Sequence, residues 1–100
     1  MPALTQYSNV YAAAVAVLQA KGFQVWCDTS TDKCFAERDG WDFCAYDPVA
    51  LLGLVALFEA RAPKEYREYW WRKEEEKGPV DLPESPVRPY VSVIFGGGTP

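Results

Sequence analysis

The chain has 100 residues, of which 49% are hydrophobic and 15% aromatic, and its formal net charge is −4. This length suits one domain, and at this size a hydrophobic core can form without a metal or a disulfide to support it. Proteins that contact the phosphates of nucleic acids or of anionic membranes are usually basic, so the acidic balance argues against both. We therefore expect no nucleic-acid partner and no membrane partner.

The first helix is expected near residues 6–21. Apolar side chains recur there at the three- and four-residue spacing that gathers them on one helical face: Tyr7, Val10, Tyr11, Ala14, Val15 and Leu18. Gly22 follows, and glycine readily takes the left-handed backbone conformation that ends many helices.

Three short strands are expected next, at 23–28, 33–38 and 41–46. Asp39-Gly40 separates the second from the third, and an Asp-Gly pair between alternating runs is the strongest short-range sign of a β-hairpin. A four-residue polar turn separates the first strand from the second. The two turns together predict an antiparallel meander that places Cys27 opposite Cys34.

Side chains alternate between the two faces of a strand, so this register assigns each residue to a face. The face expected to form the core carries Phe23, Val25, Cys27, Cys34, Ala36, Trp41, Phe43 and Ala45. The opposite face carries an apolar band among charged residues, formed by Trp26, Phe35, Cys44 and Tyr46. That band needs either a covering element or a binding partner.

The second helix is expected to begin at Asp47-Pro48. The side chain of an N-terminal aspartate accepts a hydrogen bond from a free backbone N–H, and proline suits the first helical position. Apolar residues then follow almost all round the helix, so burial on more than one side is expected. With both helices on one face of the sheet, residues 5–62 form an α+β core.

The C-terminal third is expected to add two more elements. A charged and aromatic third helix spans residues 63–77 and carries Tyr66, Tyr69, Trp70 and Trp71. A proline-rich connector over 78–89 leads to a strand over 90–95, and residues 96–100 form a flexible tail. The whole chain is interpreted as a single α+β domain.

Three cysteines are present, and neither a CxxC spacing nor any histidine accompanies them. A zinc site is therefore not expected, because a fourth ligand is missing. The N-terminal residues show no basic, apolar leader, which favours a cytoplasmic location. In that reducing compartment we expect all three cysteines to be reduced and largely inaccessible.

The absence of histidine also excludes Ser-His-Asp triads and Cys-His dyads. Carboxylates are plentiful, and paired carboxylates can carry acid–base chemistry or bind a divalent metal. Glu37 and Asp42 are expected to be cross-strand neighbours of like charge, an arrangement that a cation or a basic partner would relieve. Most acids, however, fall on solvent-facing strand positions and turns, so no catalytic, cofactor or metal site is assigned.

The order of elements resembles that of the double-stranded-RNA-binding domain: a helix, three antiparallel strands and a second helix. That family places basic residues at the start of its second helix, where they straddle phosphates. This chain has Asp47-Pro48-Val49-Ala50 at that position. The resemblance is therefore limited to the order of elements and implies no RNA binding.

The leading hypothesis is a small, acidic, cytoplasmic protein-interaction module without catalytic activity. Its candidate protein-binding residues are aromatic: Trp26, Phe35, Tyr46, Tyr66, Tyr69, Trp70 and Trp71. The last four serve either to bind a partner or to pack the third helix onto the core. The alternative hypothesis is an enzyme or a divalent-metal-binding protein that uses surface carboxylates. The C-terminal strand and the aromatic helix also offer surfaces for a homodimer.

Overall fold

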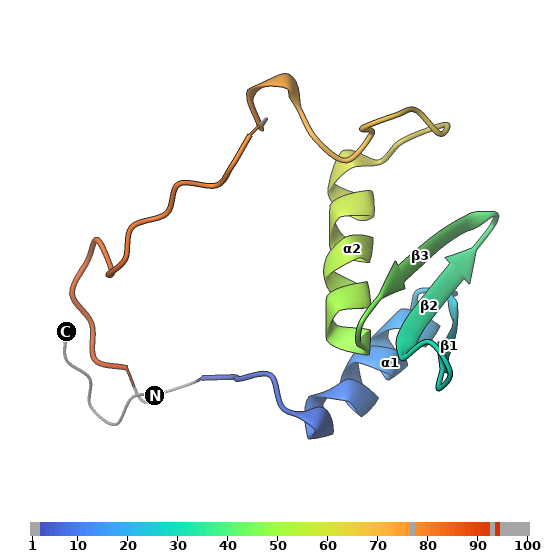
Figure 1. Cartoon of the computed structure of the whole chain (residues 1–100), viewed down its shortest axis with the longest axis horizontal. Coiled ribbons are helices and arrows are strands. Elements are labelled where there is room, and N and C mark those ends of the chain that lie inside the picture. Colours follow the sequence, from blue (N-terminus) through green and yellow to red (C-terminus); the bar gives the residue numbers. More distant parts are fainter. Residues whose placement is uncertain (1–2, 77, 93, 95–100) are drawn as a thin grey trace. The chain divides into compact units, whose positions relative to one another are not determined.

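The computed structural model describes residues 3–76, 78–92 and 94. The chain separates into two compact units, one from Gln6 to Lys73 and the other made of Met1–Thr5 with Glu74–Pro100. The first unit contains the sheet and both α-helices, and its elements are labelled in Figure 1.

The expected helix, three-stranded meander and helix are all present, which confirms the α+β class. A short 3-10 helix, η1 (Ser8–Val10), leads into α1 (Tyr11–Ala20). The strands β1 (Gln24–Asp28), β2 (Lys33–Arg38) and β3 (Trp41–Ala45) form one antiparallel sheet in the order β1-β2-β3. The helix α2 (Pro48–Arg61) follows β3.

The hairpin turn between β2 and β3 has the conformation that its sequence predicts. Asp39 and Gly40 both have positive φ, at 53° and 85°, as the mirror-image turn of a two-residue hairpin requires. Arg38 therefore lies opposite Trp41. The expected register is confirmed on both sides of β2, because the preceding four-residue turn places Cys27 opposite Cys34.

Helix α2 begins and ends close to the positions that the sequence indicates, and α1 ends close to its expected position. The Asp47 carboxylate accepts a hydrogen bond of 2.7 Å from the backbone N–H of Ala50 and so caps α2. Ala62 ends that helix in the left-handed conformation, with φ of 47°, and Pro63 follows. Gly22, after α1, has φ of 92°. The regular part of α1 is shorter than expected at its start, because η1 replaces its first turn.

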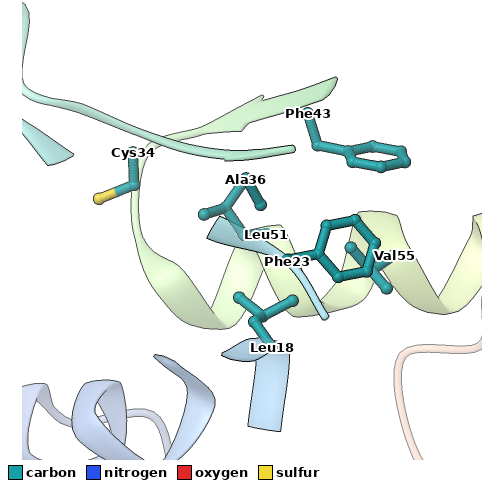
Figure 2. Close-up of a cluster of buried hydrophobic side chains, with 7 residues drawn as sticks. All are labelled: Leu18, Phe23, Cys34, Ala36, Phe43, Leu51 and Val55. Atoms are coloured by element: carbon teal, nitrogen blue, oxygen red, sulfur yellow. The ribbon is translucent and has the colours of Figure 1, made fainter. Parts of the chain in front are cut away.

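The core lies between one face of the sheet and the two helices. Leu18 of α1 and Leu51 and Val55 of α2 are fully shielded from solvent. Figure 2 shows them with the buried side chains of the sheet and the chain just before it, Phe23, Cys34, Ala36 and Phe43. Burying one such leucine or valine side chain stabilises a fold by about 1.5–3 kcal/mol relative to leaving it in water.

The prediction of a third helix over 63–77 is wrong for the residues that the structure describes. Within the described residues 63–76 the only helical segment is the 3-10 turn η2 (Glu74–Glu76). Tyr69 has a positive φ of 59°, which breaks any helix at that point. The cause is tertiary packing, since the Trp70 ring lies 5.4 Å from that of Trp41 and 6.0 Å from that of Phe58, between centroids. These contacts compete with the helix propensity of a segment that is otherwise rich in Glu, Lys and Arg.

The C-terminal strand expected over 90–95 is not observed either. Tyr90, Val91, Ser92 and Ile94 are outside any strand, while residues 93 and 95 lie outside the described part of the chain. A strand forms by pairing its N–H and C=O groups with a neighbour, and strand composition alone supplies no such neighbour. The homodimer stays a prediction, and the tail at 96–100 also lies outside the described residues.

Replacing Leu51 by alanine tests the position of the core. Leu51 is fully buried, so L51A is expected to lower the free energy of unfolding by about 2–5 kcal/mol, measured by urea titration. Leu57 on the same helix is 40% exposed, so L57A, which removes the same atoms, should lower the free energy of unfolding by less. Equal losses for the two variants would show that α2 buries a different face.

Candidate functional site

The open face of the sheet, opposite the core, carries a row of apolar residues. Trp26, Phe35 and Cys44 lie directly across from one another on the three strands. The Trp26 and Phe35 rings stack, with centroids 5.4 Å apart and planes inclined by only 14°. Trp26 remains 45% exposed, and Tyr46, which follows β3, is 80% exposed. We call Trp26, Phe35, Cys44 and Tyr46 the aromatic band.

A polar row borders the aromatic band on the side of the hairpin turn. It runs across the strands through Gln24, Glu37 and Asp42, as the register of the sheet requires. The Glu37 carboxylate accepts hydrogen bonds from the backbone N–H of Gly40 at 2.9 Å and from Gln24 Nε2 at 2.7 Å. The Gly40 bond, and then the Gln24 bond, lower the pKa of Glu37 below its ordinary value. The row is therefore anionic at neutral pH.

A second carboxylate is engaged at the other end of the sheet. Asp28 accepts hydrogen bonds from the Ser30 hydroxyl at 2.7 Å and from the Ser30 backbone N–H at 2.9 Å, which lower its pKa. Lys33 lies opposite Asp28. Asp28 and Glu37 thus each accept hydrogen bonds that stabilise a turn.

The aromatic residues of 66–71 divide into two groups that the sequence did not distinguish. Trp70 is half-buried, and its ring packs against the cluster of Trp41, Phe43 and Phe58. Tyr66 belongs to the same group, since its ring lies 6.5 Å from that of Trp41. Tyr69 and Trp71 instead pair with each other at 5.9 Å between centroids. The Arg72 guanidinium lies over the Tyr69 ring, 4.1 Å from its centroid.

Two hollows flank the segment that follows α2. One, of about 350 Å³, adjoins the β2–β3 turn and is lined by Asp39, Gly40, Trp41, Asp42, Glu65, Tyr66 and Trp70. We call it the acidic hollow. The other, of about 360 Å³, is lined by Arg61, Pro63, Lys64, Glu65, Arg67 and Trp70. Both depend on the chain reversal after Ala62, which a helix over 63–77 would not have produced.

The expectation that all three cysteines are reduced and inaccessible is wrong. Cys27 and Cys34 form a disulfide, and their Cα atoms are 3.9 Å apart. The predicted register places the two cysteines opposite each other, and the reducing compartment that was expected disfavours a bond between them. Cys44, on the open face, is free and exposed.

The alternative hypothesis finds no ligand set in the part of the chain that the structure describes. No group of three or more His, Cys, Asp or Glu side chains is placed there to hold a metal ion. Among the same residues, no helix is long and apolar enough to span a membrane.

Comparison of the chain with protein-family models, with curated proteins and with solved structures finds no match. Function is therefore inferred from the residues themselves. Their chemistry centres on two places, the aromatic band on the open face and the acidic hollow beside the hairpin turn.

Glu37 is expected to make stability depend on pH. Its pKa is lowered in the folded state, so its contribution is present above its ordinary value of 4.5 and is lost as pH falls through the folded value. The variant E37Q should be less stable than the wild type near neutral pH, and this difference should shrink in acid. Urea unfolding across a pH series measures it.

The control for this prediction is E75Q, which removes a carboxylate at an exposed position of η2. Its stability relative to the wild type should change little over the same range. A constant difference between wild type and E37Q at every pH would contradict the role given to the Gly40 and Gln24 hydrogen bonds.

Proposed function

We propose that this protein is a small, non-enzymatic protein-interaction module that binds its partner through the open face of the sheet. The observation that carries the proposal is the stacked Trp26–Phe35 pair, held on a rigid sheet and still open to solvent. Tryptophan and tyrosine dominate the binding energy of many interfaces, because they bury a large area at little conformational cost.

The surroundings of the aromatic band indicate the chemistry of the partner. The polar row on one side contains Glu37 and Asp42, two like charges that lie directly opposite each other. A lysine or arginine from a partner would relieve their repulsion and gain a charge-assisted hydrogen bond. We therefore infer a partner segment with an apolar or aromatic side chain for the band and a basic side chain for this row.

The cytoplasm is the proposed location, and a second copy of the chain is one candidate partner. A copy would have to present the basic side chain that the polar row favours. Sedimentation of the purified protein at several concentrations distinguishes a homodimer from a module that awaits another protein.

Selection from a displayed library of random peptides tests the proposal. We expect enriched peptides to combine an aromatic or large apolar residue with a nearby lysine or arginine. Binding of these peptides should weaken at least tenfold in a W26S/Y46S variant, because the variant removes the two large exposed anchors of the band.

The matched control is V17S, which removes an exposed apolar side chain from α1, on the other side of the sheet. V17S should bind the enriched peptides as the wild type does. A selection that yields no enriched sequences, or peptides that bind W26S/Y46S as tightly as the wild type, would overturn the proposal.

A further inference from the structure

The lining of the acidic hollow combines aromatic rings with carboxylates. Three of its seven lining residues are aromatic, and three carry carboxylates. No lysine or arginine lines it. At about 350 Å³ it lies at the small end of ligand-binding cavities, which span roughly 300–1,000 Å³.

The aromatic wall consists of Trp41, Tyr66 and Trp70. The Trp41 ring centroid is 6.5 Å from that of Tyr66, with planes inclined by 49°, and 5.4 Å from that of Trp70, with planes inclined by 79°. Rings inclined in this way do not form a flat stack, and all three line the hollow. A cation in the hollow can therefore lie within about 6 Å of more than one ring, the range in which a cation–π attraction is significant.

The acidic part of the lining is negatively charged, and its charge is only partly neutralised. Asp39 Oδ2 is 4.0 Å from Arg38 Nε, and Glu65 Oε1 is 3.4 Å from Arg67 Nη2. The Arg38 guanidinium is held elsewhere, because it donates to the Lys21 carbonyl at 2.8 Å and lies 4.6 Å from the Phe23 ring centroid. Both ion pairs are exposed at the carboxylate, so neither cancels much of the field.

A bare metal ion is a poor fit for this site. The three carboxylates are not arranged as a ligand set, since no metal-holding group of acids is found among the described residues. A primary ammonium is strongly hydrated and would pair with the carboxylates, which leaves the three aromatic rings without a role. A bulky, weakly hydrated cation needs only the ring faces and a nearby negative field.

We propose that the acidic hollow binds a quaternary ammonium group. Trp41, Tyr66 and Trp70 contact the methyl groups, while Asp39, Asp42 and Glu65 supply the negative potential. Such a group occurs on trimethylated lysine and on choline head groups, and the chemistry that the hollow recognises is common to both. The hollow shares no residue with the aromatic band, although Asp42 belongs both to the lining of the hollow and to the polar row that borders the band.

Titration with tetramethylammonium chloride tests the proposal directly. The indole N–H signals of all four tryptophans can be followed by NMR, with sodium chloride at matched ionic strength as the blank. We expect saturable shifts of the Trp41 and Trp70 signals and none at Trp26. Choline should bind more tightly than 3,3-dimethylbutan-1-ol, which has the same shape without the charge.

Matched variants locate the site. D39N should weaken tetramethylammonium binding by about two- to fivefold, because it removes one charge from the hollow and keeps a residue that suits the turn. The control is D32N, which makes the same change at the turn before β2, where Asp32 also has a positive φ of 59°. Y66L should reduce the preference for choline over its neutral isostere by a similar factor, because it removes an aromatic face that attracts only the cation. The fold should tolerate this change, since Tyr66 is 74% exposed and is not part of the buried core.

Two further ligands distinguish the natural sources of the group. A short lysine peptide is compared with its ε-trimethylated form, and choline is compared with vesicles of phosphatidylcholine. Tighter binding of the trimethylated peptide than of choline supports a modified protein as the ligand, and the reverse supports a lipid head group. Absence of saturable shifts, equal affinity for choline and the neutral isostere, or equal effects of D39N and D32N would overturn the proposal.

Failure here is distinguishable from failure of the protein-interaction proposal. W26S/Y46S leaves every residue of the acidic hollow in place, so it should bind tetramethylammonium as the wild type does. D39N and Y66L, in turn, leave the aromatic band intact and should still bind peptides selected on the open face.

Discussion

The two-residue turn at Asp39-Gly40 is the constraint on which the rest of the sheet depends. Because both residues take positive φ, the loop contains only these two residues, and Arg38 must lie opposite Trp41. A slip of one residue would send every side chain of β3 to the other face. Phe43 would then leave the core, and the aromatic band would lose its alignment across the three strands.

The same turn ties both candidate sites to the core. On one face it sets the row that ends at Asp42, which borders the aromatic band. At its tip it presents Asp39 to the acidic hollow, whose aromatic wall begins at Trp41. Trp41 also packs on Phe58 of α2, with ring centroids 5.0 Å apart, so the hollow rests on the hydrophobic core. The short segment 39–42 therefore forms the turn, contacts the hydrophobic core through Trp41 and contributes to both candidate sites.

Much of this arrangement could be predicted from the sequence because its determinants are local. The Asp-Gly turn, the Asp47 cap and the alternation of apolar residues each act over a few positions, and together they predict the register, both faces and the start of α2. The segment at 66–71 could not be predicted in this way. Its conformation depends on where Trp70 finds apolar cover, and that cover comes from Trp41 and Phe58 at distant positions in the chain.

The acidic hollow was missed for the same reason, since it exists only after Glu65 and Tyr66 fold back towards the hairpin turn. The disulfide was missed for a different one. The predicted register places Cys27 opposite Cys34, but the odd number of cysteines and the expected reducing compartment both argue against a disulfide.

The connectivity of the sheet has a kinetic consequence. Each strand pairs only with the strand next to it along the chain, so both loop closures span few residues and cost little entropy. Topologies rich in such neighbouring contacts fold quickly. The exception is α1, because Lys21, the residue that follows it, pairs with Glu59 of α2, 38 positions further along the chain. The meander and α2 can thus assemble first and provide the surface on which α1 docks, so α1 would be the last of these elements to pack although it precedes them in the chain.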